Sequence, residues 1–384
     1  EEYHRHRLSG CMYAGRLSIP ILATRGCPYQ CTYCSAPNMW TTRWVARTPS
    51  NVVDEMEYYI REFGASNFPL QDLTAIIQKE WIVDFCQLII DRNLNITWQL
   101  PTGTRAEAID EEVAELLKKS GMVSMAYAPE SGSDETRELI KKRIHKDKLL
   151  KSMEAAVKHD LHVSCFFVLG FPHDTGKHFK DSLSFVRTLA EAGAEDIAIG
   201  FYMALPGTEL FRKLYNQGRI KFTRDYFRHI LDSQTMAPSN LYMDVGSREM
   251  LSYWKLRIYF EFYGAKSHKN TFIGVLISVF SAIPGMFKKV HVSRMETAFR
   301  NFLTNCYRMF KAQFHPRWMP LKEELEMFEP WAKIFASTMD IKAAGAPELK
   351  EEGKINFMSV LKKEHAQRVE YKKEGLADEV TVDA

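Results

Sequence analysis

Three closely spaced cysteines constrain this chain more than any other feature. Cys27, Cys31 and Cys34 follow C-x3-C-x2-C spacing, directly after the short apolar run 19–23. Thiolates suit iron–sulfur clusters and zinc, and a loop this short can place all three sulfurs on one cluster. Three ligands are one fewer than a closed four-cysteine site needs, so one iron would keep an open position. Zinc and a disulfide are the alternatives. Zinc usually needs a second ligand pair, which is not seen, and the spacing disfavours a disulfide.

The composition is that of an ordinary globular protein, long enough for one barrel domain plus an addition. The chain has 384 residues, of which 46% are apolar and 26% are charged. Its net charge of +3 comes from 51 basic and 48 acidic residues, so we expect no nucleic acid as a partner. The other cysteines are scattered, which fits a reducing, cytoplasmic compartment. They are Cys11, Cys86, Cys165 and Cys306.

Strand-like and helix-like patterns alternate from residue 18 to residue 203. Thr48 and Pro49 begin one helix, which Gly64 ends, and Asp110 caps another. Strands separated by helices of about ten to fifteen residues indicate βαβ units and a parallel sheet. The expected strands are 18–24, 65–70, 96–100, 122–128, 161–169 and 196–203. Six such units are too few for a full eight-fold barrel.

Polar or Gly/Pro clusters follow each predicted strand. Active sites of parallel barrels lie at the carboxyl ends of the strands, so these clusters should meet at one edge. In chain order they are the cysteine loop, 71–72, 102–105, 130–133, 170–172 and 206–208.

The cysteine loop resembles the signature of the radical S-adenosylmethionine (SAM) enzymes. In that family three cysteines hold a 4Fe–4S cluster, and SAM chelates the fourth iron through its amino and carboxylate groups. The resemblance implies an α/β fold, a partial (β/α)6 TIM-like barrel over residues 16–210. It makes Cys27, Cys31 and Cys34 the metal ligands and the catalytic centre, and it places Tyr33 beside the adenine.

A second point of resemblance is the Glu-Ser-Gly-Ser run at 130–133. In the family this stretch follows the fourth strand and faces the ribose and amino-acid parts of SAM, which implies that Glu130 and Ser131 bind the cofactor. A carboxylate accepts hydrogen bonds from hydroxyls and an ammonium. The alternative is a helix start capped by Ser133 or Asp134, and both interpretations can hold at once.

Two further positions match the family less completely. Asp72 matches a residue that could hold the methionine amino group, but Gln71 stands where related sequences often carry the first of two aspartates. Arg105 matches a family arginine after the third strand and could hold a carboxylate bidentately. A solvated loop acid and an ordinary surface ion pair are the respective alternatives.

Within the superfamily, the sequence resembles the cobalamin-dependent class of oxidative cyclases, methyltransferases of lipids and natural products, and ring-remodelling enzymes. Besides the run at 130–133, the points of match are 25–28, Arg43, Arg47, 170–172 and 206–208. In that class a cobalamin-binding domain precedes the barrel. We therefore expect residues 1–15 to lead in from a missing upstream domain, and cobalamin to be bound there.

The resemblance implies an enzyme that reductively cleaves SAM to methylate, cyclise or rearrange an unreactive carbon of a hydrophobic small molecule or lipid. Its partner would be a reducing electron donor such as flavodoxin or ferredoxin. One alternative is a tRNA methylthiotransferase, although a second cysteine trio and an RNA-binding barrel are not seen. The other is a non-catalytic iron–sulfur protein, which would not need Glu130 and Asp72.

The chain changes character beyond residue 210. Aromatic residues at helical spacing predict a mainly helical extension over 211–343, followed by a charged tail, 344–384. Within the extension, 271–287 contains no charged residue and has lysines on both flanks. It could be a core hairpin, a short span, or a peripheral helix that associates with the membrane and brings the barrel to a lipid substrate.

Overall fold

The computed structural model describes residues 17–40, 42–104, 108–231 and 233–267. They belong to one compact unit, Glu1–Ala332, which is separate from Lys333–Ala384. Arg105, the apolar segment 271–287 and the tail 344–384 lie outside the described residues. The expectations that concern them therefore stay predictions.

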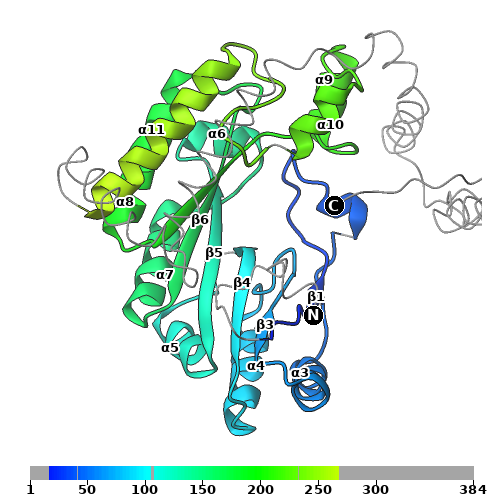
Figure 1. Cartoon of the computed structure of the whole chain (residues 1–384), viewed down its shortest axis with the longest axis vertical. Coiled ribbons are helices and arrows are strands. Elements are labelled where there is room, and N and C mark those ends of the chain that lie inside the picture. Colours follow the sequence, from blue (N-terminus) through cyan, green and yellow to red (C-terminus); the bar gives the residue numbers. More distant parts are fainter. Residues whose placement is uncertain (1–16, 41, 105–107, 232, 268–384) are drawn as a thin grey trace, which may run out of the picture. The chain divides into compact units, whose positions relative to one another are not determined.

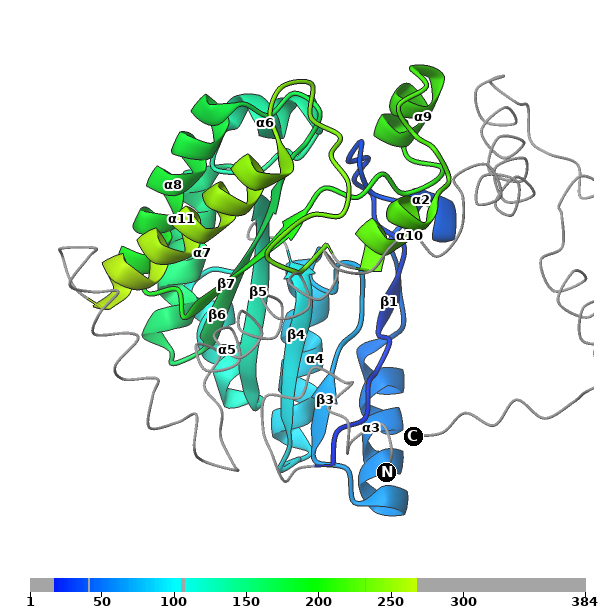
Figure 2. The same cartoon turned by 45° about the horizontal axis from the view of Figure 1, so that its top comes forward.

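A parallel sheet of five strands forms the centre of the described part, in the order β3-β4-β5-β6-β7 (Figure 1; β7 is labelled in Figure 2). Sequential order with parallel pairing is the arrangement that repeated βα units produce, and it confirms the predicted α/β class. The strands are β3 (Asn67–Pro69), β4 (Thr97–Thr104), β5 (Met122–Glu130), β6 (His162–Leu169) and β7 (Asp196–Phe201).

The first predicted strand is less regular than expected. The segment 18–21 runs parallel to β3 through isolated bridges at Ser18 and Ile21, and the N–H groups of Ile19 and Ile21 donate to β3 carbonyls at 3.0 Å. Pro20 lies between them and has no N–H group. Its backbone nitrogen is at the alternate position, which faces away from β3, and this is where an edge strand tolerates proline. The chain then forms an antiparallel pair, β1 (Thr24–Arg25) with β2 (Val45–Ala46) (Figure 2).

The helices that connect the strands lie side by side in chain order, α3 with α4, α4 with α5 and α5 with α7. Their ends follow the sequence signals. Thr48 accepts a hydrogen bond from the N–H of Asn51 at 3.3 Å, Gly64 ends α3 with φ 65°, and Asp110 caps α5. The bounds are α2 (Ala36–Met39), α3 (Pro49–Phe63), α4 (Lys79–Asp91), α5 (Glu111–Lys119), α6 (Asp134–Leu139), α7 (Lys146–Lys158) and α8 (Gly176–Glu191).

In the described ranges, three more helices follow the sheet: α9 (Glu209–Asn216), α10 (Arg224–Leu231) and α11 (Arg248–Ser267). Helix α11 packs along α8, as both views show, and its Ile258 and Phe262 are fully buried. The start of the expected helical extension thus shares the hydrophobic core of the sheet and its helices.

Among the helices in the described ranges, none combines the length and the apolar character that crossing a bilayer requires.

Strands β4 and β5 run further than predicted, to Thr104 and Glu130. Each passes a proline near its carboxyl end, Pro101 in β4 and Pro129 in β5. The pairing register shifts at both points, because proline cannot donate to the ladder and the strand bulges there. Glu130 is therefore the last residue of β5 rather than the first of the loop, and its φ is 63°.

Candidate active site

Backbone hydrogen bonds hold the cysteine loop from two sides. The N–H of Thr32 donates to the carbonyl of Ile140 at 3.0 Å, just after α6, and the N–H of Leu210 in α9 donates to the carbonyl of Thr32 at 3.0 Å. Gly26 begins the loop with φ 80°, a conformation that favours glycine. The loop therefore takes its shape from two elements that follow the sheet strands.

Cys27, Cys31 and Cys34 are half-buried thiols, as cluster ligands at a protein surface would be. Burial raises the pKa of the Cys34 thiol, and the Ala36 N–H, 3.4 Å from its sulfur, acts in the opposite direction. Within the described ranges, no three His, Cys, Asp or Glu side chains are close enough to share a single metal ion. A cubane cluster takes each thiolate on a different iron, which this loop can offer.

Tyr33 joins the cysteine loop to the loop that follows β6. Its ring packs edge-on against Phe171, with centroids 5.3 Å apart. Burial, and then the nearby Glu130 carboxylate, raise the pKa of the Tyr33 hydroxyl well above its ordinary value, so it stays neutral. The structure thus brings together Tyr33 and Glu130, two residues predicted separately.

Glu130 forms a buried ion pair that the sequence did not predict. Its Oε1 lies 3.0 Å from Nζ of Lys142, and the two side chains are only 10% and 12% exposed. Lys142 follows α6 in a Lys-Lys-Arg run, which by sequence alone resembles a solvated basic turn. The signal that could have found it is the need of a buried carboxylate for a partner.

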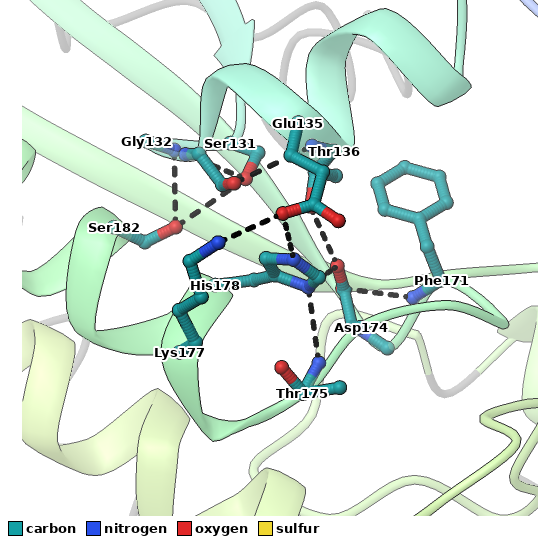
Figure 3. A network of polar contacts seen from close by, with 12 residues as sticks. Ser131, Gly132, Glu135, Thr136, Phe171, Asp174, Thr175, Lys177, His178 and Ser182 are labelled. Carbon is teal, nitrogen blue, oxygen red and sulfur yellow. Dashed lines mark hydrogen bonds and ion pairs between the residues drawn. The ribbon is translucent and has the colours of Figure 1, made fainter.

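The hydroxyl of Ser131 is held within its own loop and against α8 (Figure 3). It accepts the N–H of Ser133 at 3.1 Å and lies 3.4 Å from the hydroxyl of Ser182. The N–H of Gly132 donates to Ser182 at 3.0 Å. The Ser131 side chain is buried, so its contacts are those of a residue that shapes the loop beside Glu130. The alternative function of this run is also observed, because Ser133 caps α6.

Asp72 is fully buried and supports the entry to the cysteine loop. Its carboxylate accepts the N–H of Ala23 at 3.3 Å and the N–H of Thr24. Burial raises its pKa, and these hydrogen bonds oppose the rise. Arg47 acts on the same segment by donating to the carbonyl of Leu22 at 3.1 Å. Asp72 is thus positioned to hold the chain that leads to Cys27.

A second polar network shapes the loop after β6 (Figure 3). Asp174 accepts the N–H groups of Gly170 and Phe171 at 3.1 and 3.0 Å and the hydroxyl of Thr136 at 2.9 Å. Burial raises the pKa of Asp174 to about 6. The sequence singled out 170–172 but missed Asp174, which fixes the backbone of Phe171 and hence the ring that contacts Tyr33.

The network continues through His178, on the first turn of α8. The N–H of Thr175 donates to Nδ1 of His178 at 3.2 Å, so Nε2 carries the proton and faces Glu135 at 3.2 Å. Glu135 also pairs with Lys177 at 3.0 Å. These contacts tie the start of α8 to α6, the helix that follows Glu130.

Buried hydroxyls without a hydrogen-bond partner gather at the carboxyl edge of the sheet. In the described part of the chain, such hydroxyls lie in the cysteine loop, at the end of β4, just after β7 and in the segment between β3 and α4. They are Thr32, Thr74, Thr104 and Tyr202. An unsatisfied buried polar group costs about 1–3 kcal/mol, so this edge fits a site that a polar ligand completes.

Residues 21–207 match the model of the Radical SAM superfamily. The chain is 27% identical over 169 residues, 44% of its length, to an uncharacterized methyltransferase of Pyrococcus horikoshii. It is also 27% identical over 229 residues, 59% of its length, to the anaerobic magnesium-protoporphyrin IX monomethyl ester cyclase of Cereibacter sphaeroides. The matched part is 36% of the length of each of these relatives.

One similar solved structure is that of TsrM, a radical SAM methyltransferase from Kitasatospora setae, with tryptophan and a SAM analog bound. The superposition covers 56% of this chain and 40% of the TsrM chain, with 19% sequence identity and a TM-score of 0.47. The family match spans the cysteine loop and all five strands of the described sheet, and it ends within the turn at 206–208. The resemblance of the cysteine loop to the radical SAM enzymes is confirmed over residues 21–207, which match the model of that superfamily. Members of the superfamily hold a 4Fe–4S cluster and SAM.

Proposed function

We propose that this chain is an enzyme that reductively cleaves SAM at a 4Fe–4S cluster held by Cys27, Cys31 and Cys34. The observation that carries the proposal is the position of the three thiols. They lie on one short loop, beside the carboxyl edge of a parallel sheet, within the segment that matches the superfamily. The reduced cluster, when bound, supplies the electron that cleaves the sulfonium.

The residues around the loop divide into binding and positioning roles. Glu130 would accept hydrogen bonds from the ribose hydroxyls or the ammonium of SAM, and Tyr33 would face its adenine. Asp72 is a positioning residue, because its carboxylate holds the backbone that enters the loop. Ser131 and Arg105 stay proposed cofactor-binding residues, and the contacts of Ser131 favour a positioning role.

For the substrate we propose an unreactive carbon of a hydrophobic small molecule or lipid, modified by methylation, cyclisation or rearrangement. Similarity to a methyltransferase and to a cyclase supports these reaction types. Cobalamin assistance and a flavodoxin- or ferredoxin-like electron donor belong to the same proposal. The protein would contribute orientation and a site that excludes water.

The test is anaerobic reconstitution with iron and sulfide, followed by iron analysis and EPR of the dithionite-reduced protein. We expect about four irons per chain, as one 4Fe–4S cluster requires, and an EPR signal that changes when SAM is added. Simultaneous substitution of Cys27, Cys31 and Cys34 by Ala should remove both the irons and the EPR signal. A triple variant that keeps its irons, or a signal that is indifferent to SAM, would show the proposal to be wrong.

A further inference from the structure

The turn after α6 lies directly against the cysteine loop. The N–H of Thr32 donates to the carbonyl of Ile140 at 3.0 Å, and Sγ of Cys31 lies 3.9 Å from the carbonyl of Lys141. Lys141 has φ 56°, a left-handed conformation that is uncommon for a residue other than glycine. This turn brings the next residue, Lys142, to the cluster loop.

The ammonium of Lys142 is largely shielded from solvent. Its side chain is 12% exposed, and Nζ is 3.0 Å from Oε1 of Glu130. Glu130 is also next to the hydroxyl of Tyr33. The lysine that carries this buried positive charge directly follows the residue whose carbonyl contacts Cys31.

We propose that Lys142, held in place by Glu130, tunes the reduction potential of the cluster that the cysteine loop binds. The inference rests on the proposed function only in requiring that cluster. Reduction adds one electron, and so one negative charge, while no bond forms or breaks. Net charge and solvent exposure around a cluster set its potential. A poorly hydrated cation stabilises the added charge more than an exposed one, because screening is weak there.

The experiment is an EPR-monitored redox titration of the reconstituted protein with dithionite and mediators, without SAM. At the potential where the wild type is half reduced, we expect Lys142→Met to lower the ratio of reduced to oxidised cluster at least threefold. For a one-electron couple this is a shift of about 28 mV to more negative potential. Lys141→Met is the matched control, because Lys141 is half exposed and pairs with Glu209. Its potential should equal that of the wild type.

Three more variants keep the test decisive if Lys142→Met alone fails to assemble a cluster. Glu130→Gln removes the anion and should shift the potential to more positive values. Adding Lys142→Met to Glu130→Gln should move the potential back in the negative direction. Lys142→Arg keeps the charge and should keep the potential near that of the wild type.

Equal potentials in the wild type and Lys142→Met, or in Glu130→Gln and the double variant, would overturn the inference while the proposed function stands. The inference also fails if Lys142→Met weakens SAM binding but leaves the SAM-free potential unchanged, because the lysine then serves the cofactor. A wild type that assembles no cluster would overturn the proposed function and this inference together.

Discussion

At the scale of single residues, Glu130 links two parts of the candidate site, because its carboxylate lies beside the Tyr33 hydroxyl and 3.0 Å from Nζ of Lys142. It ends β5 with a left-handed φ of 63°, which costs about 1–3 kcal/mol for a residue other than glycine. Residues in such conformations cluster at functional sites. The bulge at Pro129 and the ion pair with Lys142 hold it there. A carboxylate in that place suits cofactor binding better than capping, because Ser133 caps α6.

We predict that Glu130→Gln weakens SAM binding and leaves the iron content unchanged. Losing a hydrogen bond that involves a charged group costs about 1.5–3 kcal/mol, or roughly one to two orders of magnitude in Kd. The measurement is calorimetric titration of the reconstituted protein with SAM. Glu115→Gln is the control, because Glu115 is a half-exposed residue of α5 that pairs with Lys119. Equal affinities in the wild type and Glu130→Gln would restrict Glu130 to a role in the loop.

The sequence indicated single site residues only where they belong to a short motif of neighbouring residues. The cysteine spacing and the Glu-Ser-Gly-Ser run, through the family resemblance, made Cys34 and Glu130 candidate site residues. Lys142 and Asp174 were missed, because nothing local distinguishes them from solvated charges. Their roles come from partners in the fold, Glu130 for Lys142 and the N–H groups of 170–171 for Asp174.

At the scale of elements, α8 closely approaches the loop after β5. A Cβ on Gly132 would lie 2.4 Å from Cα of Ser182 and 2.6 Å from the carbonyl oxygen of Asp181. Both are backbone atoms, so a side chain at 132 must push the helix away. Gly176, on the first turn of α8, has open space around its Cα.

We predict that Gly132→Ala lowers the free energy of unfolding by about 1–3 kcal/mol, the usual cost of overpacking. Gly176→Ala should be neutral or stabilise by up to about 1 kcal/mol, since alanine is the better helix former. Urea denaturation of the two variants beside the wild type measures both. If both variants unfold at the wild-type urea concentration, α8 does not press on this loop as described.

A buried lysine links α11 to the sheet. Nζ of Lys255 donates to the carbonyls of Gln234 and Thr235 at 3.1 and 2.7 Å and lies 4.6 Å from the ring centroid of Phe201. Burial lowers its pKa to about 7. A neutral amine keeps two hydrogens, enough for both carbonyls, so losing the proton does not break these contacts.

This lysine predicts how stability changes with pH. The unfolded side chain has a pKa near 10.4, so between about pH 7 and pH 10 the unfolded chain binds more protons than the folded one. The free energy of unfolding therefore rises with pH, by at most about 1.4 kcal/mol per pH unit. Urea titrations at pH 7.5 and pH 9 should show that rise in the wild type and a smaller one in Lys255→Met. Lys158→Met, at an exposed position of α7, should keep the wild-type slope, and equal slopes in all three proteins would contradict the prediction.

Element positions were largely predictable, because caps and hydrophobic periodicity are local signals. Thr48, Gly64 and Asp110 placed helix ends as observed. The differences arise at prolines. Pro20 interrupts the ladder of the first strand, while β4 continues past Pro101 through a bulge. Whether a proline ends a strand or only bends it depends on the neighbouring strand with which that segment pairs. The local sequence does not specify this partner.

At the scale of the whole molecule, the apolar segment 271–287 carries the proposal of a membrane contact, and it lies outside the described residues. Apolar residues flanked by lysines suit an anionic membrane interface. We predict that the protein floats with liposomes that contain anionic lipid and that a Leu276→Asp, Phe280→Asp variant does so less. If the folded wild type ignores neutral and anionic liposomes alike, the segment is better interpreted as part of the core.

The proposed function requires that the three thiols serve SAM chemistry and do not merely hold iron. The most direct test is a product assay of the anaerobically reconstituted chain with SAM and dithionite. We predict that 5′-deoxyadenosine, or S-adenosylhomocysteine if a methyl group is transferred, forms in the wild type and is absent from the Cys27→Ala, Cys31→Ala, Cys34→Ala variant. A wild type that carries a full complement of iron and yields neither product, or a triple variant that yields as much as the wild type, would contradict the account.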